Sequence, residues 1–215
     1  MSPPSVHPTA EIEDGVEIGE GTAIWSWVHV RGPATRIGAD CIVGERAYVA
    51  YGVDIGNRVK INAGAYLCTG VTLEDGVMVG AGVIFTNDRY PRASTPDLAE
   101  LRPSGPDERT FPTLVEAGAT IGAGSVVGCD LAVGRFAMVG MGSVVTRSVP
   151  AFHLVVGQPA RSVAIVSRAG EPLLRFSGAR PPDRDELVCP VSGLRYAVRE
   201  GHVVELDPPA PPPTP

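Results

Sequence analysis

Aromatic residues make up only 6% of this 215-residue chain, which holds four cysteines and four histidines. The cysteines lie far apart and include no CxxC pair, so we expect neither a disulfide framework nor a metal site made of cysteines. No apolar run is long enough to span a membrane, and the first eight residues lack an export-signal pattern. A formal net charge of -6 argues against nucleic acid as the main partner. We therefore expect a cytoplasmic protein that binds neither nucleic acid nor membrane.

The chain is rich in one repeat: an aliphatic residue, once replaced by Phe, stands at every sixth position over most of its length. The residue four positions further on is small or β-branched almost throughout. One extra residue, in the segment Gly32-Pro33-Ala34, shifts the row, and a long insertion interrupts it after Phe85. The row consists of Ile12, Ile18, Ile24, Val30, Ile37, Val43, Val49, Ile55, Ile61, Leu67, Leu73, Val79, Phe85, Val115, Ile121, Val127, Val133, Val139 and Val145.

A period of six indicates a solenoid of short strands. An α-helix face repeats every 3.6 residues and a plain strand alternates every second residue, so neither explains the row. In a solenoid each hexad is one short strand and a corner, and three hexads close a triangular coil. Coils stack at the inter-strand spacing of about 4.8 Å. The nineteen hexads of the row therefore predict an all-β prism of about six coils.

Three regions follow from where the row begins, breaks and ends. Residues 1–161 are expected to form the prism, interrupted by a loop over 86–113 that is rich in proline, arginine and acidic residues. Insertions of that length without regular structure are more often functional than not. Residues 162–207 are expected to form a small unit with a β-hairpin around Glu200-Gly201, and the proline-rich residues 208–215 a disordered tail.

The hexad pattern resembles that of the hexapeptide-repeat acyltransferases. The resemblance implies a left-handed parallel β-helix, although right-handed crossovers are the general rule. It also implies a homotrimer that binds an acyl-CoA in the cleft between neighbouring prisms. We therefore expect an acyltransferase that uses acetyl-CoA as the acyl donor and needs no metal.

Several segments are similar, more narrowly, to the nucleotide-sugar 3-N-acetyltransferases. These enzymes act on UDP-2-acetamido-3-amino-2,3-dideoxyglucuronate and on dTDP-3-amino-3,6-dideoxyhexoses. The similarity covers roughly residues 6–165, and its most specific part is Phe85-Thr86-Asn87 leading into a loop with Pro91-Arg92. Further matching segments are His7-Pro8-Thr9-Ala10, Ile24 to Val30, Val59-Lys60-Ile61-Asn62, Pro112-Thr113-Leu114-Val115 and Val156-Gly157-Gln158-Pro159-Ala160.

Two residues are candidates for the chemistry. The resemblance implies that Asn87 contacts the reacting centre, where an amide donor to the oxyanion of a thioester under attack is worth about 3 kcal/mol. The alternative is that Asn87 only turns the chain out of its coil. His29 should point out of the prism, because it precedes the inward Val30, and it is a candidate general base. Its alternative role is a hydrogen bond at the trimer interface beside Trp25 and Trp27.

The candidate substrate residues lie around the start of the loop. The family often has an acidic residue where this chain has Thr69, and a hydroxyl is a poor base at neutral pH. Thr69 therefore indicates a different amino sugar or another acceptor. Arg92, with Arg89 and Tyr90 beside it, is a candidate for holding a pyrophosphate or a sugar carboxylate, and ordinary solvated arginines are the alternative. Asn62 belongs to the segments that match the family and is a further candidate.

The candidate CoA residues lie in the last coils. Arg147 and Arg161 are candidates for the CoA phosphates, and Gly140 and Gly142 would let the backbone approach the pantetheine arm. The alternative for these glycines is that they only serve coil corners. Many relatives carry paired cysteines in the C-terminal unit, where this chain keeps only Cys189, so we expect no structural zinc.

We therefore predict an acetyl-CoA-dependent N-acetyltransferase that acts on the amino group of a nucleotide-linked amino sugar. The alternatives are acyl transfer to a different amine or hydroxyl acceptor, and a non-catalytic β-helix scaffold. A carbonic anhydrase on the same fold is disfavoured, because the four histidines include no closely spaced pair for a metal site.

Overall fold

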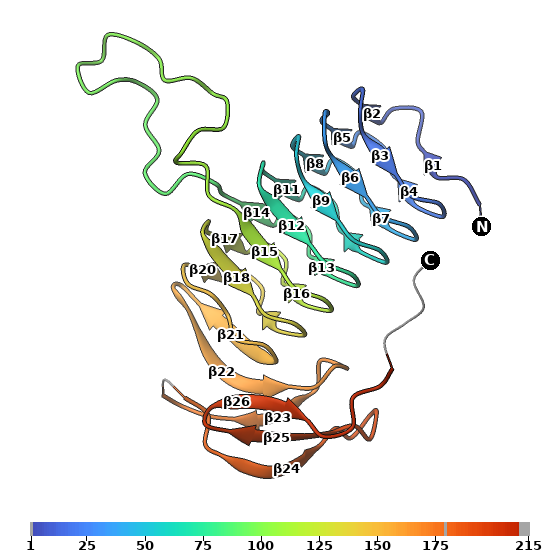
Figure 1. The fold of residues 1–215 in the computed structure, drawn as a ribbon, viewed down its shortest axis with the longest axis vertical. Helices are drawn as coiled ribbons and strands as arrows, with labels where there is room; N and C mark the ends of the chain where they lie inside the picture. Colours follow the sequence, from blue (N-terminus) through green and yellow to red (C-terminus); the bar gives the residue numbers. More distant parts are fainter. Residues whose placement is uncertain (1, 179, 211–215) are drawn as a thin grey trace.

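The computed structural model describes residues 2–178 and 180–210, and within them every regular element is a β-strand. Short parallel strands stack into a three-sided prism, whose successive coils are seen in Figure 1. A long loop leaves the prism near its middle, and a C-terminal unit follows its last coil. The fold is thus the all-β parallel helix of hexads that the sequence predicts.

Each face of the prism is a parallel sheet. Face 1 consists of β1 (Ser5–Val6), β4 (Ala23–Ile24), β7 (Ile42–Val43), β10 (Lys60–Ile61), β13 (Met78–Val79), β16 (Thr120–Ile121), β19 (Met138–Val139) and β21 (His153–Gly157). Face 2 consists of β2 (Glu11–Ile12), β5 (His29–Val30), β8 (Tyr48–Val49), β11 (Tyr66–Leu67), β14 (Ile84–Phe85), β17 (Val126–Val127) and β20 (Val144–Val145). Face 3 consists of β3 (Glu17–Ile18), β6 (Arg36–Ile37), β9 (Asp54–Ile55), β12 (Val71–Leu73), β15 (Thr113–Val115) and β18 (Leu131–Val133). The corners between them are called edge 1/2, edge 2/3 and edge 3/1.

The described part of face 1 holds parallel strands from about eight turns, so the sequence-based count of about six coils is too low. The difference arises at the two ends. β1 pairs in parallel with β4, and β21 pairs in parallel with β19, although the row of hexads was counted only from Ile12 to Val145. Backbone pairing with one neighbouring strand keeps these end strands in the stack even where side-chain burial is incomplete, as at Val6, which is 40% exposed.

The interior of the prism is filled by the aliphatic row and by the small residues four positions later. Val43, Val49 and Ile55 are completely buried, and Phe85 is the one aromatic residue in the buried core of the described prism. Backbones of successive turns come very close at the corners. A Cβ added to Gly122 would lie 2.5 Å from the backbone nitrogen of Met141, so only glycine fits at that corner.

The loop occupies residues 86–112, because Thr113 is already the first residue of β15 and is buried. It connects face 2 to face 3 and therefore replaces one corner of edge 2/3. Asp88 and Thr110 pair in an antiparallel bridge near its base. The base of the loop is thereby held on the prism, while its middle projects away from the coils in Figure 1.

The C-terminal unit reverses the strand direction. β22 (Ala160–Val166) runs antiparallel to β21 and β23 (Pro172–Arg175) antiparallel to β22, while β24 (Arg184–Val188), β25 (Arg195–Arg199) and β26 (His202–Glu205) form a separate antiparallel sheet. Its core combines aromatic and aliphatic side chains, and the Phe152 ring lies 5.4 Å from that of Phe136 and 5.6 Å from that of Tyr196. The tail predicted to be disordered, 208–215, lies outside the described residues from 211 onward.

Candidate functional site

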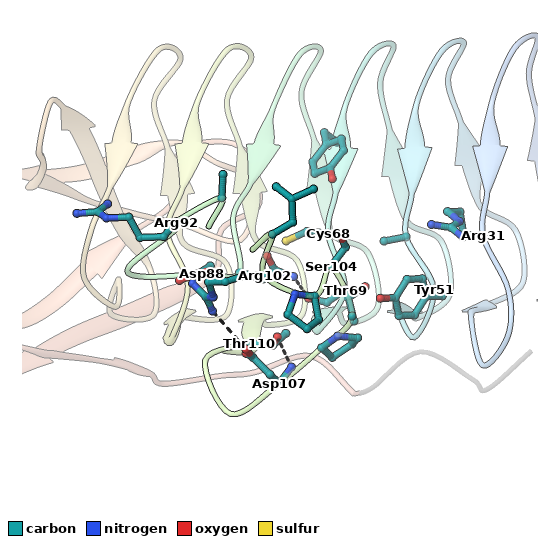
Figure 2. Close-up of a pocket in the computed structure, with 18 of the residues that line it drawn as sticks. Arg31, Tyr51, Cys68, Thr69, Asp88, Arg92, Arg102, Ser104, Asp107 and Thr110 are labelled. Atoms are coloured by element: carbon teal, nitrogen blue, oxygen red, sulfur yellow. Dashed lines mark hydrogen bonds and ion pairs between the residues drawn. The ribbon is translucent and has the colours of Figure 1, made fainter. Parts of the chain in front are cut away.

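A cavity of about 590 Å³ opens at edge 2/3, between the loop and the outer surface of the prism. Residues of four successive turns build one wall and residues of the loop build the other, as Figure 2 shows. The prism contributes Arg31, Tyr48, Ala50, Tyr51, Tyr66, Cys68, Thr69 and Asn87. The loop contributes Asp88, Arg92, Ala93, residues 101–107 and Thr110.

The prism wall brings Asn87 and Thr69 together. They are 18 residues apart and occupy equivalent corners of successive turns, and the Asn87 side-chain amide donates a hydrogen bond to the Thr69 carbonyl at 3.2 Å. The Phe111 N–H donates to the Asn87 carbonyl at 2.8 Å, so the Asn87 backbone is held as well. An asparagine amide carries two N–H donors, and the second remains for a ligand. Asn87 is therefore an oriented donor at the mouth of the loop.

Face 2 carries a ladder of aromatic side chains beside the cavity. His29, Tyr48 and Tyr66 are the outward residues of β5, β8 and β11 and lie one turn above another. The His29 and Tyr48 rings meet edge to face at 5.6 Å, and the Tyr48 and Tyr66 rings stack at 5.0 Å. Tyr66 is 43% exposed, so the ladder offers an aromatic surface on which an apolar or ring-shaped part of a ligand can pack.

Glu13 fixes the end of this ladder. Its Oε1 accepts hydrogen bonds from His29 Nε2 and Arg31 Nε, each at 3.0 Å, and its Oε2 accepts one from the Gly32 N–H at 3.1 Å. Desolvation acts to raise the pKa of Glu13, but these hydrogen bonds outweigh it and lower that pKa from its ordinary value. An ionised Glu13 selects the His29 tautomer with its proton on Nε2, which leaves Nδ1 as the acceptor nitrogen. The Arg31 guanidinium is also held, 5.4 Å from the centre of the Tyr51 ring.

The loop wall contains an arginine between two aspartates. Arg102 Nη2 donates to Asp107 Oδ2 at 3.3 Å, and Arg102 Nη1 lies 3.8 Å from Asp88 Oδ2. Nη1 is buried and makes no hydrogen bond within the described residues. Arg102 thus brings a charged donor group to the cavity without using all of its hydrogens.

Three of the residues predicted from the sequence line the cavity: Asn87, Thr69 and Arg92. Arg92 is exposed, and among residues 2–178 and 180–210 its guanidinium donates only to the carbonyl of the neighbouring Pro91, at 2.8 Å. His29 belongs to the same turn as Arg31 but does not line the cavity. Its hydrogen-bond partner is Glu13 of the preceding turn.

The other predicted substrate residues lie outside the cavity. Arg89 donates to Asp130 Oδ2 at 2.7 Å and lies over the ring of Phe111, so it braces the base of the loop. Tyr90 is 67% exposed. Asn62 lies at a corner of edge 1/2, across face 2 from the cavity.

The predicted CoA residues do not gather at the cavity either. Gly140 and Gly142 lie at edge 1/2, where the Gln158 side-chain amide donates to the Gly142 carbonyl at 2.8 Å from the turn between β21 and β22. Arg161 is an exposed residue at the start of β22, near this turn. Arg147 lies at edge 2/3, two turns beyond the loop.

Edge 1/2 has a smooth strip on its outer surface. Four successive turns place a glycine at positive φ there, and a Cβ added to any of them would meet nothing within 4 Å. These residues are Gly64, Gly82, Gly124 and Gly142. The strip leaves the backbone open to close approach by a ligand or by another chain.

Sequence reasoning missed much of the cavity lining. Tyr48 and Tyr66 carry a usable signal, because each directly precedes an inward residue of the hexad row and they are 18 residues apart. That spacing places them one above the other on the outer surface. Asp88 and Arg102 carry no such signal, since the loop has no periodicity that fixes where its side chains lie.

Within the two described ranges, no three His, Cys, Asp or Glu side chains are grouped closely enough to hold a metal ion. A helix of sufficient length and apolar character to cross a membrane is likewise not found there.

A prism of stacked hexads with a lined cavity at one corner defines a hexapeptide-repeat β-helix protein. Two family descriptions match this chain. "Hexapeptide repeat of succinyl-transferase" matches residues 34–68 and 112–147, and "Bacterial transferase hexapeptide (six repeats)" matches residues 52–87. The chain belongs to the hexapeptide-repeat transferase family.

Individual relatives are similar over part of their length. A dTDP-3-amino-3,6-dideoxy-alpha-D-galactopyranose 3-N-acetyltransferase of Aneurinibacillus thermoaerophilus is 38% identical over 94 residues, which cover 44% of this chain and 45% of that protein. The bifunctional protein GlmU of Rubrobacter xylanophilus is 33% identical over 187 residues, covering 72% of this chain and 40% of that protein. The chain therefore spans less than half the length of either relative.

A solved structure shows the shared fold. It is a point mutant of AntD, an N-acyltransferase from Bacillus cereus, in complex with dTDP and coenzyme A. Its TM-score is 0.51 at 17% identity, with 78% of this chain and 85% of that chain covered.

Proposed function

We propose that this chain is a subunit of an acetyl-CoA-dependent N-acetyltransferase that acylates the amino group of a nucleotide-linked amino sugar. The observation that carries the proposal is the cavity at edge 2/3, which residues of a long loop line together with the oriented amide of Asn87. The similarity to a dTDP-amino-sugar N-acetyltransferase supports it from the sequence side.

In the proposed reaction, the neutral amine attacks the thioester carbonyl carbon, and a C–N bond replaces the C–S bond. The free N–H of the Asn87 amide donates a hydrogen bond to the oxyanion that develops on the carbonyl oxygen. The CoA sulfur leaves as a thiolate and takes up a proton, while the new amide nitrogen loses one. Solvent accepts the proton from nitrogen, because His29 of the same subunit lies three turns, about 14 Å, from Asn87.

The proposed enzyme is a homotrimer whose sites lie between neighbouring prisms. The cavity and the glycine strip lie on opposite sides of face 2, which suits a ligand bound between two copies of this chain. We propose that CoA runs along the strip of one subunit, past Gly140 and Gly142 and near Arg161, and reaches the cavity of the next. Arg147 then lies on the cavity side of the cleft. A cytoplasmic location suits an enzyme that draws on CoA.

The variant Asn87→Ala tests the chemistry. It should lower the turnover number about 100-fold, because one donor to an oxyanion is worth about 3 kcal/mol. Asn87→Asp keeps the size of the side chain but removes both N–H donors, so it should lose as much. The measurement is thiol release from acetyl-CoA with a panel of UDP- and dTDP-linked 3-amino sugars.

CoA binding serves as a control and should match the wild type in the two variants. A cooperative thermal transition shows that each variant is folded, although both lose the hydrogen bond from Asn87 to the Thr69 carbonyl. A turnover number within a few-fold of wild type in both would remove the oxyanion role from Asn87. No thiol release with any acceptor, together with no CoA binding by calorimetry, would overturn the proposed function and leave a non-catalytic scaffold.

A further inference from the structure

The guanidinium of Arg102 is incompletely satisfied in the cavity wall. Its buried Nη1 makes no hydrogen bond within the described residues, and its ionic neighbours Asp107 and Asp88 lie at 3.3 and 3.8 Å. Good charge-assisted N–H···O bonds are shorter, about 2.7–2.9 Å. Asp88 also accepts a backbone hydrogen bond from the Tyr90 N–H at 2.7 Å, and Asp107 accepts one from the Arg109 N–H at 2.8 Å. The loop therefore supports Arg102 without saturating it.

A buried charged donor without a partner is unfavourable, and a guanidinium does not lose its proton in a protein. A ligand that supplies the missing acceptor removes this penalty. The side chains lining the cavity include three arginines, Arg31, Arg92 and Arg102, against two aspartates, Asp88 and Asp107, a formal excess of one positive charge. The missing acceptor is therefore an anion, and a planar carboxylate matches the fork of a guanidinium.

The position of Arg102 along the cavity separates two sources of that anion. Its neighbour Asp88 directly follows Asn87, so Arg102 lies at the end of the cavity where the amine is acylated. Figure 2 shows the order Asp88, Arg102, Thr69 and Arg31 along the cavity. Arg31 lies three turns from Asn87, about 14 Å away at about 4.8 Å per turn. An anion at Arg102 is thus close to the reacting sugar, and an anion at Arg31 is remote from it.

We propose that Arg102 binds a carboxylate carried by the sugar itself, so that the preferred acceptor is a nucleotide-linked amino-uronate and not a neutral deoxyhexose. This inference rests on the proposed function, which places an amino sugar in the cavity. The diphosphate then lies toward Arg31, whose guanidinium is held by Glu13 and Tyr51.

Binding of sugar nucleotides that differ only at C6 tests the inference. Calorimetric titrations compare UDP-glucuronate with UDP-glucose and dTDP-glucuronate with dTDP-glucose, so that the nucleotide preference need not be known. With the matching nucleotide, the acid should bind at least about tenfold more tightly, as expected for a charge-assisted hydrogen bond. Arg102→Met should remove this preference, and Arg102→Lys should retain part of it. Arg109→Met, in the same loop but outside the cavity lining, should bind like the wild type.

Three results would overturn the inference. The first is an equal dissociation constant for the acid and the neutral sugar nucleotide in the wild type. The second is the absence of binding by either acid. The third is an equal loss of affinity for both sugars in Arg102→Met, which would place the diphosphate at Arg102.

These titrations need no acyl transfer, so they separate the inference from the proposed function. Acetyl transfer to neutral amino sugars without any preference for the acid would keep the function and overturn the inference. Selective binding of the acid through Arg102 without thiol release from acetyl-CoA would keep the carboxylate site and overturn the transferase. Unchanged thermal unfolding of Arg102→Met shows that the variant is folded.

Discussion

The prism and the C-terminal unit are stabilised in different ways. Buried side chains of the prism are almost all aliphatic, and charged pairs such as Arg36 with Asp54 lie outside, with 63% and 52% of their side chains exposed. The core of the C-terminal unit is centred on the aromatic rings of Phe152 and Tyr196, and the Glu205 side chain is only 4% exposed between Arg135 and Arg168. The prism therefore spreads its stability over many equivalent contacts, whereas the C-terminal unit concentrates it in a few side chains.

This difference predicts in which region a single substitution should lower the stability most. In a repeat fold, stability is close to a sum of contacts between neighbouring repeats, so damage to one turn has a graded effect. The C-terminal unit has no repeat to share the loss. The two tryptophans of the chain, Trp25 and Trp27, both lie in the prism, so their fluorescence reports its unfolding. Far-UV circular dichroism reports both regions.

The largest effect is expected at Phe152, which joins the two regions. It is completely buried between Phe136, at a corner of the prism, and Tyr196 of β25. Phe152→Ala should destabilise the C-terminal unit by about 3–5 kcal/mol through the cavity it creates. The circular dichroism transition should then move to lower denaturant than the fluorescence transition. Coincident transitions in the variant would mean that the two regions unfold as one and that the contrast is wrong.

The second largest effect on the free energy of unfolding is expected at the buried ion pairs of Glu205, compared with an exposed ion pair of the prism. Glu205→Gln should cost about 3 kcal/mol, because it leaves two arginines without their buried carboxylate. The matched variant Asp54→Asn, in the exposed pair on face 3, should cost less than about 1 kcal/mol. Denaturant unfolding of both variants provides the comparison. A similar loss of unfolding free energy in both variants would show that a buried ion pair stabilises the C-terminal unit no more than an exposed pair stabilises the prism.

The smallest effects come from two cysteines whose pKa values move in opposite directions. Desolvation acts to raise the pKa of Cys189 in the C-terminal unit, but hydrogen bonds with the Ser167 and Ser192 side chains and with backbone N–H groups lower it to about 7. In the prism, desolvation raises the pKa of Cys68 to about 12. The ordinary pKa for both thiols is 9.0.

The two shifts predict opposite slopes of stability against pH. A lowered folded pKa means that the unfolded state holds more protons between pH 7 and 9, so the contribution of Cys189 rises with pH there and is lost as pH falls through about 7. A raised folded pKa means that the contribution of Cys68 is present below pH 9 and is lost as pH rises toward about 12. Unfolding measured across both windows should lose the first slope in Cys189→Ala and the second in Cys68→Ala. If the slope of stability against pH stayed unchanged in either variant, that slope would come from titratable groups other than the replaced cysteine.

The prism was predictable from the sequence because one inward side chain per hexad repeats the same physical requirement along the chain. The number of turns was underestimated because the strands at the two ends of the prism lack the full side-chain pattern. The outermost strands are held largely by backbone hydrogen bonds, which leave little trace in side-chain pattern, as at Val6. The aromatic core around Phe152 and Tyr196 was not predictable, since it joins segments that no period relates.

The candidate site likewise has a part that the sequence predicts and a part that it does not. Asn87 and Thr69 lie in the periodic part, and their spacing of 18 residues puts them in contact through one hydrogen bond. Arg102 lies in the aperiodic loop, where only the folded backbone decides which side chain faces the cavity. The roles of Asn87, His29, Arg92 and the remaining candidates stay predictions until the variants are measured.

The reversal of direction between β21 and β22 has a consequence for how the chain associates. A stack of parallel strands ends in a row of unpaired N–H and C=O groups, which is a template for adding further strands from other chains. The antiparallel return of β22 covers that row on face 1 with a strand of the same chain. The parallel edge of face 1 is thereby occupied at this end by the chain itself and is not free to pair with a strand of another molecule.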